Sequence, residues 1–135
     1  MTYAATRELI NTHVQAIAGL PPVQLENTPN IGKTGQAFTR VTVAPLRATE
    51  LTMGLTGQDL VRGVVRIDLF FPQNKGTAEA AALADTVVAA FPRGLYLADA
   101  DVLLNFGPPS VDVGAIVEPF YILPILVEYS SARTT

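Results

Sequence analysis

Few residues in this chain combine the side-chain types and the spacing that catalysis or ligand binding requires. Gly32, Lys33 and Thr34 match the end of a phosphate-binding loop, but that motif needs a glycine five positions before Gly32, where this chain has Asn27. The segment also does not run from a hydrophobic strand into a helix. We therefore interpret Lys33 as a cation on a surface loop and do not predict a nucleotide site.

Asp99 and Asp101 form a short acidic pair at the entrance of a predicted strand, and two carboxylates one residue apart can share a divalent cation. Leu103 and Leu104 follow where a calcium loop would supply further oxygen ligands, so we favour a role in a turn and in solubility. The chain has no cysteine and a single histidine, which removes thiolate metal sites, cysteine nucleophiles and the usual Cys/His zinc sites. We predict no metal and no cofactor.

His13 is the one residue that a histidine-dependent catalytic triad would have to use. It falls near Ile10 and Ile17 on a predicted helix, so we interpret it as a packing or partly exposed surface histidine. The remaining carboxylates are single and lie among mixed neighbours, so no pair of general acid and general base stands out. We predict that the chain is not an enzyme. A small hydrolase is the remote alternative, and it would need carboxylates that converge in a cleft around Asp99 and Asp101.

Three arginines form the remaining candidate cluster. Arg62 and Arg66 project from one face of a predicted strand, and Arg40 can join them, which is an arrangement suited to a phosphate backbone. The formal net charge of the chain is -3, however, and no aromatic stacking pattern accompanies these arginines. We therefore do not predict specific nucleic-acid recognition and favour a subunit interface, for which arginine is better suited than lysine.

The composition predicts one domain that meets another subunit. A chain of 135 residues forms a single core, so we expect one domain, 1–135, and exclude a cleft between two domains. Only 16% of the residues are charged and 49% are hydrophobic, which leaves too little charge to cover a monomer. Residues 1–19 lack the apolar core of a signal peptide, and the apolar stretch 119–127 is too short to span a membrane, so we expect a soluble protein with no membrane partner.

Two segments have the apolar periodicity of amphipathic helices. Residues 3–18 form the first, with Thr2 as its N-cap and Gly19 after its end. Residues 77–91 form the second, and Thr77 is placed to cap its start. Their apolar stripes, which we expect to face the core, are Ile10, Val14 and Ile17 in the first helix and Ala80, Leu83, Ala84, Val87, Val88 and Phe91 in the second.

β-Branched and alternating segments predict the strands. Residues 61–71 give the strongest pattern, with apolar side chains on one face and Arg62, Arg66 and Asp68 on the other, so one side faces the core and the other is charged. Residues 118–129 are apolar on both faces, which is typical of a strand in the middle of a sheet or of one covered by another subunit. The other expected strands are 23–25 at an edge, 38–44, which 49–53 continues or returns, and 101–106.

The fold that this order predicts is α+β, with two helices packed on one face of a mainly antiparallel or mixed sheet and the order helix, strands, helix, strands. Charge divides along the chain. Residues 33–75 carry six basic and three acidic side chains, whereas residues 76–135 carry two basic and seven acidic ones. Parts of opposite charge complement a second copy head to tail, and heterologous contacts of that kind close into rings. Scattered, solvated charge is the alternative interpretation.

Several short motifs resemble those of the phage tail terminator-like family, whose members come from phages with long, non-contractile tails. The resemblance extends over most of the chain, including the opening helix with Tyr3 and the long strand after Pro108-Pro109-Ser110. The motifs are structural rather than chemical, and they are Phe-Thr-Arg-Val-Thr-Val-Ala-Pro at 38–45, Leu-Thr-Met-Gly at 51–54, Gly-Val-Val-Arg-Ile-Asp-Leu-Phe-Phe-Pro at 63–72 and Gly-Thr-Ala-Glu-Ala-Ala-Ala-Leu-Ala-Asp at 76–85.

The resemblance implies a structural virion protein at the head-tail junction, assembled in the host cytoplasm. It implies a ring of identical subunits, a hexamer, that caps the tail tube protein, stops its polymerisation and offers a docking surface to the head connector or stopper protein. DNA would pass through the lumen without sequence-specific binding. The family has no catalytic residues, so the resemblance implies none here.

Two other virion proteins are the alternatives, namely a head-completion or connector (neck) protein and a tail tube subunit. For the subunit interface or the lumen of the ring we select five charged residues. They are Arg62, Arg66 and Asp68 on the polar face of the predicted central strand, and Arg47 and Glu50 in the hairpin that precedes it.

Overall fold

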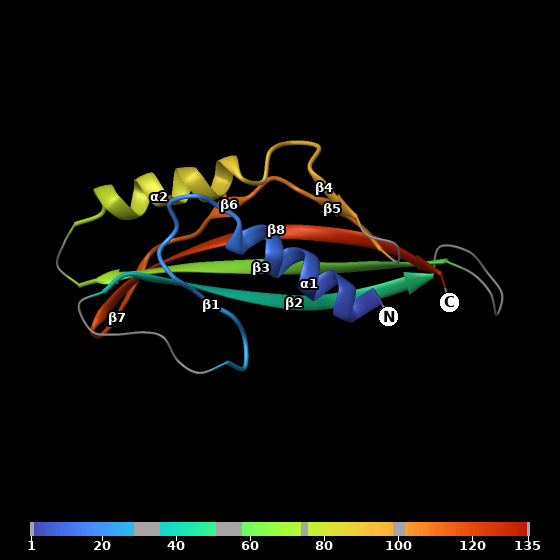
Figure 1. The fold of residues 1–135 in the computed structure, drawn as a ribbon, viewed down its shortest axis with the longest axis horizontal. Coiled ribbons are helices and arrows are strands. Elements are labelled where there is room, and N and C mark those ends of the chain that lie inside the picture. The colour runs from blue at the N-terminus through green and yellow to red at the C-terminus, as the bar shows by residue number, and fades with distance from the viewer. Residues whose placement is uncertain (1, 29–35, 51–57, 74–75, 99–101, 135) are drawn as a thin grey trace.

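Three long strands form the centre of the molecule, and two helices belong to the core on one side of them (Figure 1). The computed structural model describes residues 2–28, 36–50, 58–73, 76–98 and 102–134. In chain order the elements are α1 (Thr2–Gln15), β1 (Val23–Gln24), β2 (Phe38–Glu50), β3 (Gln58–Pro72), α2 (Ala78–Ala89), β4 (Tyr96–Ala98), β5 (Leu103–Phe106), β6 (Ser110–Val111), β7 (Ala115–Val117) and β8 (Phe120–Thr134). The fold class is α+β, as the sequence predicts.

The sheet is antiparallel except at one edge. β3 lies between β2 and β8 and is antiparallel to both, and its pairing with β8 runs from Gln58 opposite Thr134 to Pro72 opposite Phe120. β1 adds to the outer side of β2 in parallel. On its other side β8 pairs in turn with β5, β6 and β7, and β4 follows β5. The strand predicted at 118–129 therefore lies in the middle of the sheet.

β2 is longer than the sequence predicts. We expected a strand at 38–44, but β2 continues to Glu50, because a β-bulge between Pro45 and Arg47 absorbs the proline without ending the strand. Of the segment 49–53, which we expected to continue or return this strand, residues 49 and 50 continue it, and residues 51–53 lie outside the described part of the chain.

α1 forms where the apolar periodicity predicts it, and it ends at Gln15 rather than at residue 18. Ile10 and Val14 on its inner face are 0% exposed. Ile17 packs against the same core from the turn after the helix, where its N–H donates to the carbonyl oxygen of Val14 at 3.1 Å. Gly19 follows with a φ of +84°, a left-handed conformation that glycine adopts without steric cost.

Four of the six residues in the predicted stripe of α2 are buried, three within the helix and Phe91 just after it. The short alanine side chains let the helix approach the sheet closely. Thr77 occupies the N-cap position, but its side chain makes no hydrogen bond to the helix, so the predicted side-chain cap is wrong. The stripe residues that are at most 3% exposed are Ala80, Ala84, Val87 and Phe91.

His13 joins the two helices. Its Nε2 lies 2.8 Å from the carbonyl oxygen of Ala90, the residue after α2, so a neutral ring protonated on Nε2 donates to one of the carbonyls that a helix end leaves unpaired. The ring also contacts Phe91 edge to face, with the centroids 5.0 Å apart. His13 is a packing residue, as the sequence analysis favours.

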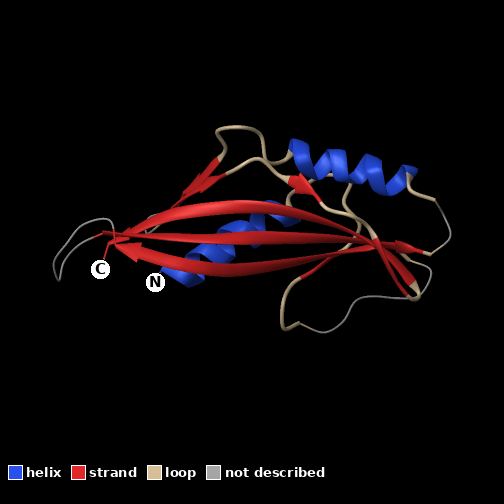
Figure 2. Cartoon of the chain, turned by 180° about the vertical axis from the view of Figure 1, so that it is seen from behind, coloured by secondary structure: helices blue, strands red, loops and turns tan. Residues whose placement is uncertain are grey.

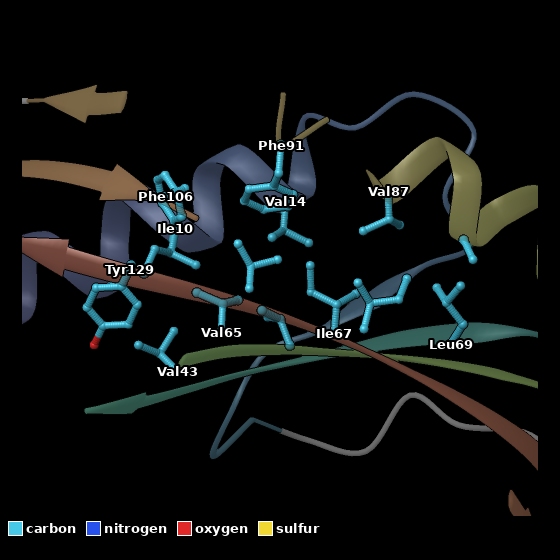
Figure 3. Packing of buried hydrophobic residues seen from close by; sticks show 14 of the residues in the cluster. Ile10, Val14, Val43, Val65, Ile67, Leu69, Val87, Phe91, Phe106 and Tyr129 are labelled. Atoms are coloured by element: carbon cyan, nitrogen blue, oxygen red, sulfur yellow. The ribbon is translucent and has the colours of Figure 1, made fainter. Parts of the chain in front are cut away.

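The core lies between the helices and one face of the sheet (Figure 3). β3 contributes Val65, Ile67 and Leu69, which are 0% exposed, and this is the apolar face that its alternation predicts. α1 and α2 both belong to this core cluster. Figure 2 shows the long strands from the opposite side, where no described helix covers them. That second face and the sheet edges are the surfaces left for other molecules.

Gly63 makes room for an aromatic ring that crosses β3. Gly63 is opposite Tyr129 in the pairing of β3 with β8, and a Cβ atom at Gly63 would overlap the Tyr129 ring. Tyr129 is 4% exposed and belongs to the core cluster, so the ring cannot move aside without disturbing its packing. Glycine is needed here for the close approach of a side chain.

Gly63→Ala is expected to lower the free energy of unfolding by about 1–3 kcal/mol, because the added methyl group displaces the Tyr129 ring. Gly107→Ala is the matched control, since a Cβ atom there meets nothing nearer than 3.8 Å, and it should change stability by less than about 0.5 kcal/mol. Denaturant unfolding of the two variants measures the difference. Equal stabilities would show that the ring is not held against Gly63.

Candidate functional site

We call the sheet face that no described helix covers the helix-free face. Three aromatic rings pack together at one end of it. Phe38 and Phe70 stack with their centroids 4.3 Å apart, and Phe120 meets them edge to face at 5.3 and 5.6 Å. The guanidinium of Arg40 lies 4.9 Å from the centroid of the Phe70 ring, which is a cation–π contact. These contacts hold the rings against one another and place Arg40 beside the centre of the face.

Asp68 lies at this centre on the charged face that the alternation predicts, and it is buried there. Its side chain is 2% exposed. Its Oδ1 accepts a hydrogen bond from Nε of Arg66 at 2.9 Å, and its Oδ2 lies 3.5 Å from a guanidinium nitrogen of Arg40. Both arginine side chains are about half exposed and shield the carboxylate from water. Arg40 is the cross-strand neighbour of Asp68 on β2, so pairing of the strands creates the network.

Arg47 and Arg62 form a second group, apart from the Asp68 network. They are opposite each other in the pairing of β2 with β3, and both are exposed. Together with Glu128 they line a depression of about 640 Å³. Like charges at opposite positions repel, so the pair favours an anionic neighbour. Glu50 ends the same strand, and its side chain lies outside the described part of the structure.

A smaller depression of about 320 Å³ adjoins the first one on the side of α1. It is lined by Tyr3, Tyr129 and Ser131, and Leu46 and Arg47 line both depressions. Burial raises the pKa of the Tyr129 phenol above its ordinary value of 10.0, because the ionised form would lose hydration. The Oγ of Ser131 is buried and has no hydrogen-bond partner among the described residues.

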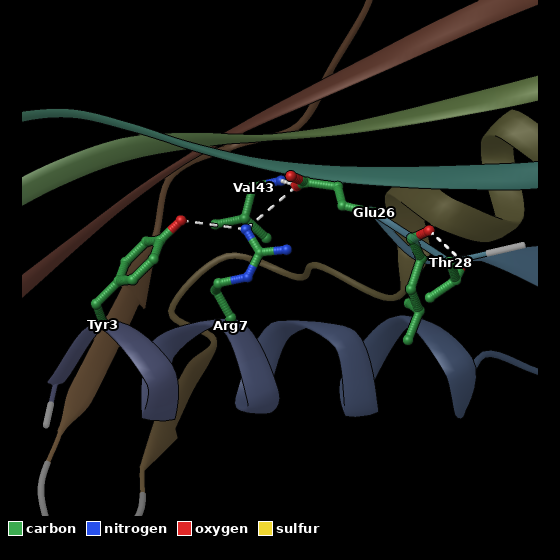
Figure 4. Close-up of polar contacts among 6 residues, drawn as sticks. Tyr3, Arg7, Glu26, Thr28 and Val43 are labelled. Atoms are coloured by element: carbon green, nitrogen blue, oxygen red, sulfur yellow. Dashed lines mark hydrogen bonds and ion pairs between the residues drawn. The ribbon is translucent and has the colours of Figure 1, made fainter.

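Arg7 ties α1 to the outer edge of β2 (Figure 4). It donates a hydrogen bond to the Tyr3 hydroxyl oxygen at 3.2 Å and lies 3.3 Å from Oε1 of Glu26. The hydrogen bond to Tyr3 and the negative charge of Glu26 raise the pKa of Arg7. The same oxygen of Glu26 accepts the backbone N–H of Val43 at 2.6 Å. Glu26 thereby occupies a backbone donor on the outer edge of β2.

The outer edge of β2 is guarded over its first half and open over its second. Thr39 donates its N–H outwards to the carbonyl oxygen of Pro22 at 2.8 Å, and Val43 donates to Glu26. Pro45 continues this alternation and has no N–H to offer. Beyond the bulge, β2 pairs only with β3 among the described strands. An incoming strand therefore finds the N–H groups of Thr39 and Val43 occupied and none at Pro45, whereas no described strand covers the segment beyond it.

An exposed apolar segment on the opposite edge is a feature that the sequence analysis did not assign. We define the β6–β7 arm as residues 110–118. Its β-branched content was the available signal, but strands of two and three residues are too short to show a periodicity. Its exposed apolar side chains are Val111 (48%), Val113 (83%), Ile116 (62%) and Val117 (57%).

The described residues hold no group of three His, Asp or Glu side chains close enough together to bind a metal ion. Lys33, Asp99 and Asp101, which the sequence analysis considered, lie outside the described part of the chain. Among the described residues, no helix is long and apolar enough to cross a membrane.

A small α+β subunit with open sheet edges and an exposed apolar arm has the features of a protein that assembles with others. Residues 3–129 match the family described as phage tail terminator protein, and the chain belongs to this family. It is therefore a phage tail protein. This agrees with the resemblance found in the sequence motifs.

Solved structures share the fold. Thirteen of their chains match, and one, whose title names no function, is 20% identical with a TM-score of 0.73 over 96% of this chain and 92% of its own. At that identity the similarity concerns the fold alone. No curated protein matches the chain.

Asp68→Asn is expected to lower the free energy of unfolding by about 1–3 kcal/mol, because two guanidinium groups lose the anion that holds them. Glu128→Gln is the matched control. It removes an exposed carboxylate that makes no ion pair with any described residue, and it should change stability by less than about 0.5 kcal/mol. Denaturant unfolding measures both variants. An Asp68→Asn variant as stable as the control would show that the network does not stabilise the fold.

The stability contributed by neutral, buried Tyr129 is expected to be fully present below pH 10.0, the ordinary tyrosine pKa, and to be lost as the pH rises through the raised pKa of the folded state. The unfolded chain ionises at this residue first, so alkali favours unfolding. Tyr129→Phe should therefore reduce the loss of stability above pH 10.0. Tyr96→Phe, whose ring is 63% exposed, should retain the wild-type dependence. Unfolding curves between pH 8 and pH 11 are the measurement, and an unchanged alkaline slope in Tyr129→Phe would contradict the argument.

Proposed function

We propose that the chain assembles into a ring, a hexamer by resemblance to its family, that caps the tail tube. The ring stops polymerisation of the tube protein and presents its other side to the head connector or stopper protein. The observation that carries the proposal is the family match over residues 3–129. The ring then acts at the head-tail junction of the virion, after assembly in the host cytoplasm.

The architecture of the subunit supports assembly through its sheet. One open edge lies on β2 and the other on β7, at opposite sides of the pair formed by β3 and β8. Two different surfaces that meet head to tail generate a ring when the rotation closes. The low charge of the chain and the exposed apolar arm also favour covered surfaces.

The two groups of arginines support different roles in such a ring. Arg47 lies on the edge strand β2 and Arg62 lies opposite it on β3, so we assign this pair to a subunit contact, with Glu50 at the end of β2. Arg66 and Asp68 lie further along the helix-free face of β3, and we assign this central part of the face to the lumen. Half-exposed guanidinium groups there suit a passing DNA backbone, which they would meet without reading its sequence.

Termination in this proposal is steric and geometric. The ring docks onto the last ring of the tube through one surface. Its other surface lacks the polymerising element of the tube protein, so growth ends there. No bond is made or broken, and the chain needs neither a cofactor nor a metal.

The test adds the purified chain to polymerising tube protein and measures tube lengths by negative-stain microscopy. We expect short tubes that carry a ring at one end, and a discrete mass near six copies for the chain alone in light scattering, weakened by salt because charged contacts are screened. Arg93→Glu, an exposed arginine away from both groups, is the control and should behave as wild type.

Each alternative gives a different result in the same experiment. A tail tube subunit would form long tubes by itself. A neck protein would bind DNA-filled heads and leave tube lengths unchanged. Either result would overturn the terminator proposal.

A further inference from the structure

The β6–β7 arm is an unguarded sheet edge. β7 pairs with β8 along one side, and its three residues are exposed. Between β6 and β7, the N–H of Asp112 donates to the carbonyl oxygen of Pro124 at 2.9 Å, and the N–H of Val113 donates to Oδ1 of Asp112 at 2.7 Å. Four β-branched apolar side chains of the arm are 48–83% exposed. Natural sheets cover or charge such edges, so the arm has the properties of a segment that another molecule covers.

The bulge of β2 and its neighbour on β3 offer an acceptor, which we define as the bulge surface, Leu46 and Arg47 on β2 and Arg62 on β3. Leu46 is 66% exposed and lies between the two depressions, whose volumes are about 320 and 640 Å³. Neither arginine makes an ion pair with a described residue. The bulge surface therefore has an apolar side chain, Leu46, next to two cationic ones, and the two depressions adjoin it.

The arm and the bulge surface are complementary in charge. Asp112 and Glu118 are exposed carboxylates of the arm, and neither makes an ion pair with a described residue. Two anions beside four apolar side chains thus match two cations beside an exposed leucine, and these two cations outnumber Glu128, the exposed carboxylate of the larger depression.

The arm and the bulge surface lie on opposite sides of β8, so one chain cannot join them. β3 and β8 lie between β2 and β7. A contact between the arm and the bulge surface therefore links two copies through unlike patches, which is the kind of contact that closes a ring. An arm that met another arm would instead place carboxylates against carboxylates.

We propose that the β6–β7 arm of one copy docks against the bulge surface of the next copy. Its apolar side chains lie over Leu46 and reach into the flanking depressions, while Asp112 and Glu118 lie beside Arg47 and Arg62. The occupant is a second copy of this chain, because both complementary surfaces are present on it. This inference rests on the proposed ring and names the contact that holds its subunits together.

The first test uses the absence of cysteine from the chain, since introduced cysteines then report one contact only. Leu46→Cys and Val113→Cys are combined in one chain, oxidised mildly and separated on a non-reducing gel. We expect a ladder of cross-linked species that ends at the copy number of the ring. Chains with the single substitutions, when mixed, should stop at a dimer. Ala82→Cys combined with Val113→Cys is the matched control, because Ala82 is exposed on α2, and it should give no ladder.

The second test reverses the charges. Arg47→Glu with Arg62→Glu should weaken self-association at least tenfold in light scattering, because like charges then meet across the contact. Adding Asp112→Arg and Glu118→Arg to the same chain should restore it. Circular dichroism and thermal unfolding check that each variant folds.

The possible results distinguish a failure of the proposed contact from a failure of ring formation. A ladder and a rescued charge swap support the proposed contact. A wild-type ring with neither cross-linking nor a charge effect overturns the contact and leaves the ring in place. A wild-type monomer at every concentration, without cross-linking, overturns both the contact and self-assembly of the ring.

Discussion

The pairing of β3 with β8 is the constraint on which the rest of the structure depends. The two strands are matched from one end to the other, so the period-two alternation of each places a complete row of apolar side chains on the same face. A slip of one residue would move Val65, Ile67 and Leu69 to the opposite face. Both helices dock on this apolar row, and Tyr129 finds its place because the same register sets it opposite Gly63. Register therefore decides both the core and the composition of the other face.

The helices cover only one side of a sheet whose three central strands are unusually long for its size. The chain stabilises the other side by different means, with stacked aromatic rings at one end and a buried carboxylate held by two arginines at the centre. Such a face is stable in water yet rich in arginine. An assembling protein gains from this combination, because the subunit remains folded before its neighbours arrive. The edges differ: one is largely guarded by Glu26 and Pro45, and the other is left apolar.

Much of this could be predicted from the sequence, because the signals are local. The stripe of α2 and the alternation of β3 each extend over several turns or strand repeats, so their periodicity identifies the element and its buried face. Asp68 could not be placed in the same way. The alternation of β3 puts Asp68 on the polar face. Its burial depends on neighbours from other strands, Arg40 on β2 and Pro124 on β8, which the sequence does not reveal. The predicted strand at 38–44 stops before Pro45, because a proline would end a central strand. β2 is an edge strand beyond this point, and its bulge accommodates the proline. The β6–β7 arm has strands too short for any period, so its exposure follows from tertiary pairing alone.

The guarded half of β2 has a consequence for how copies are stacked. The open stretch begins beyond Pro45, near one end of the central strands, whereas the arm pairs with β8 near the other end. Two copies joined edge to edge therefore cannot align flush, and each is displaced along the strand direction relative to the last. In a closed ring, the offsets of successive copies along the strand direction all have the same sign and add up. The last copy meets the first only if the strands are inclined to the ring axis. In the proposed ring, the position of a single proline would thereby influence how far the strands are inclined to the ring axis.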